Sequence, residues 1–394
     1  MKKNIGVYLA AKPSSGGAYQ YNLSMVKALE SIDTGKYDIT AFYFDANWDE
    51  VIPNNFIKVR VVKNFFGRVY SKFYRMLNNT PAGRGSAGRF LQAVKAVNAS
   101  NCDLIICPSQ DALAYQTNKR SVATIHDLMH RYEPHFEEYQ HGEYGRRELH
   151  CSAICKYSTV ILVDSEIGRQ HVIESYSVDA DKVFVLPFVP PFYLLNSREI
   201  DVKSKYSLPD RFIFYPAQFW EHKNHLKLFE ALKILKEDRV DVDLVLVGSK
   251  ENNYEKSMGA IKRFGLCDRV HVLGYVPNDD TYSLYKNAVA MTFVSLAGPT
   301  NIPPMEALLT GCPLICSNAY AMPEQVGDAA LLVDPKDPVD IAKKIKRIWQ
   351  DEILRNELIK KGFQRTQEYG QKDFDLILGN VIDRVVLDGS GGLS

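Results

Sequence analysis

A lysine, two histidines and several aromatic residues crowd the stretch Phe214–His225. An apolar run that predicts a strand comes before it, and an amphipathic pattern that predicts a helix follows. Lys223 lies just before that helix, where its ammonium group and the helix dipole would reinforce each other on an anion. The spacing therefore predicts an anion-binding loop. The alternative is a solvated lysine beside a packed Trp220.

A second loop, Ser295–Ala307, combines small residues with the start of a helix. Pro303 and Pro304 suit the first turn of a helix, and we expect Glu306 within that turn. Its carboxylate would either stabilise the helix dipole or accept two hydroxyl groups of a ribose. A purely structural loop is the alternative. Three backbone N–H groups are candidates for binding sugar hydroxyls or phosphate oxygens: those of Thr300, Asn301 and Ile302.

The first half of the chain holds a glycine-containing loop, Pro13–Tyr19, between a predicted strand and a predicted helix. Gly16 and Gly17 allow the backbone to pass close to a ligand, and the helix N-terminus offers N–H groups and a partial positive charge. The loop predicts a phosphate-binding site, although it lacks the GxGxxG fingerprint of dinucleotide binding. A simple strand–helix turn is the alternative.

His126 and Asp127 follow another predicted strand. Side chains at the carboxyl end of a parallel strand are placed to face a ligand. A lone His–Asp pair is weak evidence, so a structural histidine is the alternative. The surrounding residues match neither HExxH nor a serine or cysteine nucleophile motif, and we predict no metal site.

No acidic residue occurs from Val51 to Cys102, whereas nine lysines and arginines lie within residues 58–95, with aromatic residues between them. A basic amphipathic surface of this kind could rest on anionic lipid or bind a lipid-linked acceptor. A nucleic-acid patch and a plain solvated face are the alternatives. From this window we expect an anionic membrane surface. The net charge of the chain is only +1, which gives no global attraction to nucleic acid, and we expect no nucleic acid as partner.

Short apolar runs alternate with helical patterns in both halves of the chain. Strands rich in β-branched residues that alternate with helices are typical of a parallel α/β sheet with right-handed crossovers. Three prolines within Leu186–Phe192 interrupt the alternation. We therefore predict two Rossmann-like domains, 1–190 and 205–370, then a terminal helix, 371–388, that packs back on the first domain, and a tail, 389–394.

The chain has 394 residues, of which 46% are hydrophobic and 24% charged. These proportions are typical of a folded soluble protein and exclude a disordered or fibrous one. No apolar run approaches the roughly 18 residues that span a bilayer, and Met1–Leu9 predicts a first strand rather than a signal peptide. The scattered cysteines predict buried, reduced thiols. We expect a cytoplasmic protein that can lie at the inner face of the membrane.

With these pieces in order, the chain resembles the retaining glycosyltransferases of family four, which have two Rossmann-like domains in the GT-B fold. The resemblance covers nearly the whole chain. It is most specific in the second half, where three segments follow in the family's order and spacing: the Lys223–Asn224 loop, Leu273–Val276 and the loop leading to Glu306–Ala307. The form of the first and third segments resembles a bacterial branch that builds surface polysaccharides.

The resemblance implies transfer of a hexose from a nucleotide sugar to an acceptor hydroxyl, with retention of anomeric configuration. It implies neither a metal nor a cofactor, and an acceptor that is a growing glycan or a sugar linked to polyprenyl diphosphate. His126 would lie near the donor sugar, Lys223 would neutralise the diphosphate, and Glu306 would hold the ribose. The other donor-binding residues that it implies are Gly16, Gly17, Gln218, Gly274, Tyr275, Val276, Thr300, Asn301 and Ile302.

Two positions depart from the family's pattern. Gln218 stands where the family usually has an arginine, so one cation fewer would face the diphosphate. Gly298 stands where the first of two glutamates usually contacts the donor sugar. These departures keep two alternatives open: a nucleotide-sugar epimerase of the same architecture, and a relative that binds a nucleotide sugar without catalysis.

Overall fold

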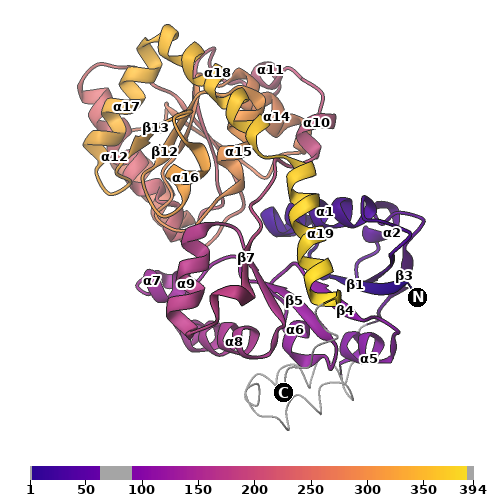
Figure 1. Ribbon diagram of the computed structural model, residues 1–394. Coiled ribbons are helices and arrows are strands. Elements are labelled where there is room, and N and C mark those ends of the chain that lie inside the picture. The colour runs from indigo at the N-terminus through magenta and orange to yellow at the C-terminus, as the bar shows by residue number, and fades with distance from the viewer. Residues whose placement is uncertain (1, 63–90, 388–394) are drawn as a thin grey trace. The chain divides into compact units, whose positions relative to one another are not determined.

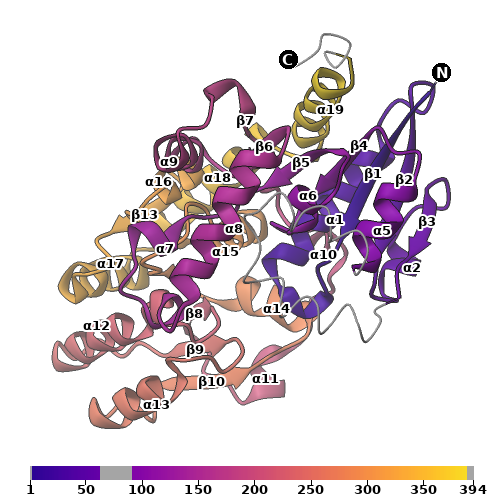
Figure 2. The same cartoon turned by 90° about the horizontal axis from the view of Figure 1, so that it is seen from below.

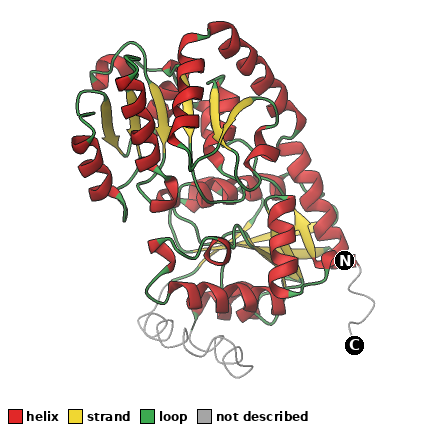
Figure 3. Ribbon diagram, turned by 90° about the vertical axis from the view of Figure 1, so that its left-hand side faces the viewer, coloured by secondary structure: helices red, strands yellow, loops and turns green. Residues whose placement is uncertain are grey.

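The computed structural model describes residues 2–62 and 91–387 (Figure 1). They form two compact units, of which the second consists of Glu133–Gln140 and Pro190–Gly370 and the first of the remaining described residues. Each unit is a parallel β-sheet with helices packed against it (Figure 3). The predicted fold class, α/β with two Rossmann-like domains, is confirmed.

The sheet of the first unit has seven parallel strands in the order β3-β2-β1-β4-β5-β6-β7. The order reverses between β1 and β4, and open α/β sheets bind ligands beside such a switch point. The sequence predicts six of the strands but not β7, whose three residues are too few to show a pattern. The strands are β1 (Lys3–Leu9), β2 (Tyr37–Tyr43), β3 (Ile57–Arg60), β4 (Leu104–Cys107), β5 (Arg120–Thr124), β6 (Val160–Val163) and β7 (Val183–Val185).

The C-terminal helix α19 packs on α1, and both belong to the first unit (Figure 1). Gln371 Nε2 donates to the Ser24 carbonyl at 3.0 Å, and Ser31 Oγ donates to Asp375 Oδ2 at 3.0 Å. The chain therefore returns to the unit in which it began. The helices of this unit are α1 (Gly17–Glu30), α2 (Trp48–Val51), α5 (Gln92–Ala99), α6 (Leu113–Gln116), α7 (Met129–Tyr132), α8 (Glu143–Tyr157), α9 (Glu166–Tyr176) and α19 (Gln371–Leu387).

The sheet of the second unit has six parallel strands in the order β10-β9-β8-β11-β12-β13. Figure 2 shows β8, β9 and β10 side by side. Here the order reverses between β8 and β11, so the loops that follow these two strands flank the switch point. The strands are β8 (Ile213–Pro216), β9 (Leu244–Val247), β10 (Val270–Gly274), β11 (Ala290–Phe293), β12 (Leu314–Ser317) and β13 (Ala330–Val333).

Helices of the second unit pack in pairs, α12 on α17 and α15 on α18. They are α10 (Tyr193–Asn196), α11 (Val202–Tyr206), α12 (His225–Glu237), α13 (Tyr254–Arg263), α14 (Asn278–Asn287), α15 (Ile302–Thr310), α16 (Met322–Val326), α17 (Pro338–Gln350) and α18 (Glu352–Glu368).

The central strands consist almost entirely of buried apolar residues. Every residue of β4, β6, β9, β11 and β12 is buried. Strands covered by helices on both faces show this continuous pattern, and each fully buried Leu, Ile or Val contributes about 1.5–3 kcal/mol. Polar chemistry is therefore left to the loops at the carboxyl ends of the strands.

One placement differs from the sequence prediction. The segment Glu133–Gln140, predicted within residues 1–190, belongs to the second unit. Its contacts explain the difference: Tyr320 OH donates to Glu133 Oε1 at 2.6 Å, and Glu138 is bound by two residues of the second unit, described below.

Three predictions concern the surface. Six of the seven cysteines are buried, but Cys267 is exposed, contrary to the prediction of buried thiols. Most of the basic window lies outside the described residues, because they exclude 63–90. Within residues 2–62 and 91–387, every helix is too short or too polar to cross a bilayer.

Candidate functional site

The loop of Lys223 follows β8, beside the switch point of the second sheet. The chain makes a short 3-10 turn, Glu221–Lys223, before α12 begins. Asn224 joins the two with a φ of 63°, a left-handed conformation that asparagine tolerates. Its Nδ2 donates to the carbonyls of Val294 at 3.0 Å and Pro335 at 2.7 Å. These bonds fix the turn from which the lysine projects.

The Lys223 ammonium group connects the two loops that flank the switch point. Its Nζ donates to Asn301 Oδ1 at 2.9 Å and lies 5.3 Å from the centre of the Phe293 ring. Tyr215 OH donates to the Lys223 carbonyl at 2.6 Å and so holds the backbone below it. The contacts orient a compact positive charge at the carboxyl edge of the sheet, where an anion would meet it.

The Asn301 side chain bonds to Lys223, and its backbone bonds to Gln325. Its N–H donates to Gln325 Oε1 at 3.1 Å, and its carbonyl accepts from Gln325 Nε2 at 2.7 Å. The Asn301 N–H is thus engaged by the protein in this structure, and its role toward a ligand stays a prediction. The corresponding roles of Thr300 and Ile302 stay predictions.

Gly298 is the residue that allows Asn301 to stand beside Lys223. Its φ is +102°, and a Cβ at this position would lie 2.9 Å from Asn301 Nδ2. L-amino acids rarely adopt this backbone conformation. The position that departs from the family's pattern therefore has a local structural reason to be glycine.

Substituting Gly298 with alanine should displace the Asn301 amide from Lys223 and strain the loop. Strain of this kind costs about 1–3 kcal/mol, so we expect weaker binding of nucleoside diphosphate and a lower melting temperature. Calorimetric titration with GDP and UDP measures the first effect. Gly259→Ala is the matched control, because a Cβ there meets no atom within 4 Å. Equal affinity of both variants would contradict the assigned role.

Glu306 is a buried carboxylate on α15 whose two oxygens accept from two tyrosines. Tyr193 OH donates to Oε1 at 2.8 Å and Tyr285 OH to Oε2 at 2.7 Å. The structure corrects the prediction that Glu306 lies in the first turn, because the first turn of α15 contains no acidic residue. Burial raises the pKa of Glu306, while the two tyrosine bonds oppose that rise. Each carboxylate oxygen retains a second lone pair for a ligand hydroxyl.

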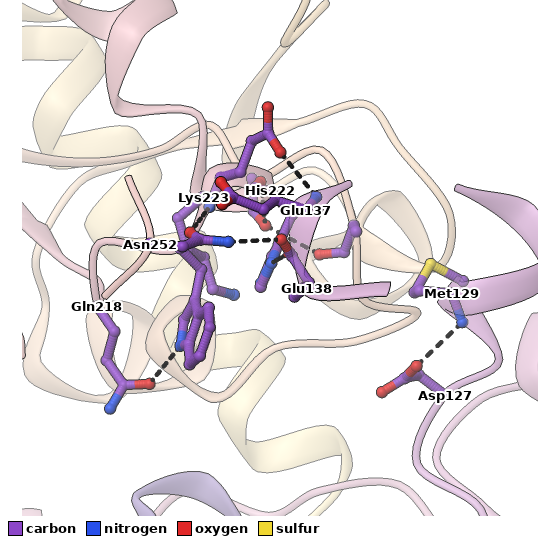
Figure 4. A network of polar contacts seen from close by, with 12 residues as sticks. Asp127, Met129, Glu137, Glu138, Gln218, His222, Lys223 and Asn252 are labelled. Carbon is purple, nitrogen blue, oxygen red and sulfur yellow. Dashed lines mark hydrogen bonds and ion pairs between the residues drawn. The ribbon is translucent and has the colours of Figure 1, made fainter. Parts of the chain in front are cut away.

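Gln218 and the neighbouring strand ends complete this edge of the second sheet. Gln218 is exposed, and its Oε1 accepts from Trp220 Nε1 at 3.0 Å (Figure 4). Gly248, after β9, approaches so closely that a Cβ would lie 2.3 Å from the Ala217 carbonyl oxygen. Its N–H donates to the carbonyl of Gly274 at 2.9 Å. The glycine at the end of β9 therefore shapes the edge of the site.

The predicted nucleobase segment begins where β10 ends. Gly274 has a φ of +74° with open space where a Cβ would stand. The Tyr275 side chain is 81% exposed, whereas Val276 is buried. The structure thus places an exposed tyrosine directly after β10, and contact of this segment with a base stays a prediction.

The remaining predicted residues lie in the first unit, after β1 and β5. Gly16 and Gly17 are exposed, and Gly16 caps α1 with a φ of +56° and open space at its Cβ position. The His126 ring packs against two aromatic rings. The distance between ring centres is 5.1 Å to Tyr21 and 5.8 Å to Phe188. The Asp127 carboxylate accepts from the Met129 N–H at 3.0 Å and so has a local capping role (Figure 4).

The hydrogen bonds of His126 define what its ring offers. Nε2 lies 2.9 Å from the carbonyl of Pro108, which can only accept, so Nε2 carries the proton. Burial lowers the His126 pKa, while Asp127 and the Pro108 carbonyl oppose that shift. Buried Nδ1 has no partner among the described residues. A neutral His126 can thus accept a hydrogen bond from a sugar hydroxyl through Nδ1.

Asp111, in the loop after β4, is a site candidate that the sequence analysis missed. Its buried Oδ2 has no hydrogen-bond partner within the described part of the chain. Burial raises the pKa of this carboxyl to about 7. A carboxylate with a perturbed pKa beside a switch point is typical of functional sites.

Asp111→Asn is expected to stabilise the fold at neutral and alkaline pH. A carboxyl with a pKa near 7 when folded and near 4 when unfolded opposes folding once it ionises, by up to about 4 kcal/mol. The penalty is absent at pH 4, grows as the pH rises and is complete above pH 7. Urea unfolding of wild type and variant between pH 4 and pH 8 measures this difference, which a pH-independent gap would contradict.

Several residues of the site give no recognisable sequence signal. Tyr193, Tyr285 and Gln325 contact predicted residues from other elements, and only the structure brings them together. Gly248 could have been found, because a glycine directly after a buried strand marks a close backbone approach.

Among the described residues, His, Cys, Asp and Glu form no group of three that could hold a metal ion.

Parts of the chain are similar in sequence to known glycosyltransferases. Residues 196–365 match the family model of glycosyl transferases group 1. The O-antigen chain mannosyltransferase B of Escherichia coli is 27% identical over 64% of this chain and 67% of its own length. The serotype-specific mannosyltransferase WbdA of Escherichia coli is 25% identical over 61% of this chain, and the match spans only 30% of that protein.

Solved structures share the fold over nearly the whole chain. Sucrose-phosphate synthase from Thermosynechococcus elongatus has a TM-score of 0.73 and 19% identity, with 99% of this chain and all of that chain covered. HepE from Anabaena, in complex with UDP and glucose, has a TM-score of 0.73 and 17% identity, over 97% and 99% of the two chains. The fold is that of the GT-B glycosyltransferases. The chain is similar to the group 1 family over residues 196–365, less than half of its length, and to the mannosyltransferase above, in agreement with the resemblance found in its sequence.

Proposed function

We propose that this chain is a retaining glycosyltransferase that moves a mannosyl residue from a nucleoside-diphosphate sugar to a hydroxyl group of a growing surface glycan. The observation that carries the proposal is the Lys223 ammonium group at the switch point, oriented by Asn301. A cation for the diphosphate and a carboxylate, Glu306, for the ribose match two of the three parts of a nucleoside diphosphate. The mannosyl group and the glycan are inferred from the names of the relatives.

Charge stabilisation is the first task of the site. As the bond between the anomeric carbon and the phosphate oxygen breaks, negative charge grows on the diphosphate. Lys223 supplies a positive charge that is already in place, and helix N-termini add partial charges. Because Gln218 replaces the family's arginine, Lys223 carries more of this task. The chain supplies the charge itself, so we propose that transfer proceeds without a metal ion.

Retention requires the acceptor to attack from the face that the diphosphate leaves. In the proposed step the bond from the anomeric carbon to the phosphate oxygen breaks, and a bond from that carbon to the acceptor oxygen forms. The proton of the acceptor hydroxyl goes to the departing phosphate oxygen. Gly298 lacks a carboxylate, which supports a route without a covalent intermediate at this position.

The acceptor in this proposal is a glycan carried on polyprenyl diphosphate at the inner face of the membrane. The basic, acid-free window from Val51 to Cys102 supports an anionic surface as partner. In its described part, Lys58 Nζ donates to the Asp49 carbonyl at 2.9 Å, and Arg60 forms an ion pair with the Asp49 carboxylate at 3.4 Å. Co-sedimentation with vesicles of anionic phospholipid tests the surface.

The test of the activity is product formation from a panel of GDP-, UDP- and dTDP-sugars, with a mannose-terminated glycan on polyprenyl diphosphate as acceptor. We expect release of nucleoside diphosphate and an α-linked product by NMR, unchanged by EDTA. Isomerised donor without acceptor would identify an epimerase instead. Nucleotide binding without product for every donor would identify a non-catalytic relative.

A further inference from the structure

A short acidic segment from the first half of the sequence forms part of the second unit. Residues 133–140 lie against the loop that carries Lys223, as Figure 4 shows for Glu137 and Glu138. The Glu137 N–H donates to Glu221 Oε2 at 2.9 Å, and Tyr320 OH donates to Glu133 Oε1 at 2.6 Å. The segment is thus fixed to this loop and, through Tyr320, to the region after β12.

Glu138 is the most enclosed charge of this segment. Its side chain is only 9% exposed, and that of its partner His222 only 18%. His222 Nδ1 pairs with Glu138 Oε1, and Asn252 Nδ2 donates to Glu138 Oε2 at 3.1 Å. Burial alone would raise the pKa of Glu138. The bonds from His222 and Asn252 lower it by more, so that the pKa lies below its ordinary value. The carboxylate is therefore ionised at neutral pH, with a protein partner on each oxygen.

His222, which is held by Glu138, also bonds to the second of the two loops that flank the switch point. It directly precedes Lys223, and its own carbonyl accepts from the Leu296 N–H at 2.8 Å and from Ser295 Oγ at 3.3 Å. Residues 295 and 296 begin the loop that leads to Asn301, the partner of the Lys223 ammonium group. One residue thus ties the acidic segment, the lysine loop and the asparagine loop together.

We propose that Glu138 is a positioning residue that, through His222, sets the place of the Lys223 ammonium group and thereby tunes binding of the donor's diphosphate. The inference rests on the proposed function, because it assumes that Lys223 binds that diphosphate. The Glu138 carboxylate bonds to His222 and Asn252. Its effect reaches the anion through the backbone that joins His222 to Lys223.

The test compares Glu138→Gln with its neighbour Glu137→Gln by calorimetric titration of the full chain with GDP and with UDP. In catalysis, a misplacement of about 1 Å can cost about 100-fold in rate. For binding we expect a smaller effect, with Glu138→Gln weakening affinity about tenfold. Glu137→Gln should remain within about twofold, because that side chain is 48% exposed and its ion pair with Lys256 is long, at 3.7 Å.

A double-mutant cycle separates positioning from a general structural role. If Glu138 acts through His222, then His222→Gln and the double variant should lose about as much affinity as Glu138→Gln, without additivity. Additive losses, or wild-type affinity in Glu138→Gln, would overturn the inference. If Glu138→Gln does not fold, wild-type affinity in His222→Gln would overturn it equally. Failure of the wild-type chain to bind either nucleotide would instead refute the proposed function.

Discussion

Lys223→Ala is expected to lower turnover by two to three orders of magnitude while the protein stays folded. Removing one preorganised charge or donor that stabilises the transition state costs about 3–4 kcal/mol in well-studied sites. Here the expected loss lies at the upper end, because Gln218 leaves Lys223 without the arginine that usually shares its task. The Lys223 side chain bonds to Asn301 at the edge of the sheet and not within the core, so its removal leaves the apolar packing of β8 and α12 in place.

Turnover of the nucleotide-sugar donor identified in the panel measures this effect, with melting temperature as the check on folding. Lys227→Ala is the matched control, since Lys227 lies four residues further along the chain, in α12, and pairs with Glu230 at 2.7 Å. We expect the control to retain wild-type turnover. Near-normal turnover of Lys223→Ala would show that the diphosphate is neutralised elsewhere.

The fold could be predicted largely because the strands are buried on both faces. β4 and β12 are continuous apolar runs between turn residues, and such runs appear in the sequence whatever packs against them. β7 was not predictable, because a three-residue strand is defined by its pairing with β6 rather than by its own pattern. The same reason applies to residues 133–140, whose place depends on partners 80 or more residues away along the chain.

A candidate site residue could be predicted only where the elements that orient its side chain adjoin it in the sequence. Lys223 could be recognised because the turn and the helix that orient it adjoin it in the sequence. The bond from the Asn301 N–H to Gln325 could not be predicted, because Gln325 lies in α16, 24 residues further along the chain. Glu306 was expected in the first turn of its helix, but it is the fifth residue of α15, which begins at Ile302.

Glu306→Gln is expected to weaken binding of a ribonucleoside diphosphate about tenfold to a hundredfold. Hydrogen bonds to a charged group are worth about 1.5–3 kcal/mol, roughly twice those to a neutral one. Glutamine keeps the shape of the side chain but offers one accepting oxygen, which the tyrosine hydroxyls then share with the ribose. Because burial raises the pKa of Glu306, wild-type affinity should also fall as the solution is acidified through that raised pKa, whereas the affinity of the variant should not follow this titration.

The ribose itself provides the control for this prediction. Wild-type protein should bind GDP more tightly than 2′-deoxy-GDP, because the deoxy sugar leaves one lone pair of the buried carboxylate without a donor. In Glu306→Gln that preference should shrink towards unity, while a variant that merely destabilises the fold would weaken both ligands alike. Tyr193→Phe and Tyr285→Phe should keep the preference, since each leaves the carboxylate and one tyrosine bond in place. An undiminished preference in Glu306→Gln would mean that the ribose lies elsewhere and that Glu306 serves only to join α15 to α10 and α14.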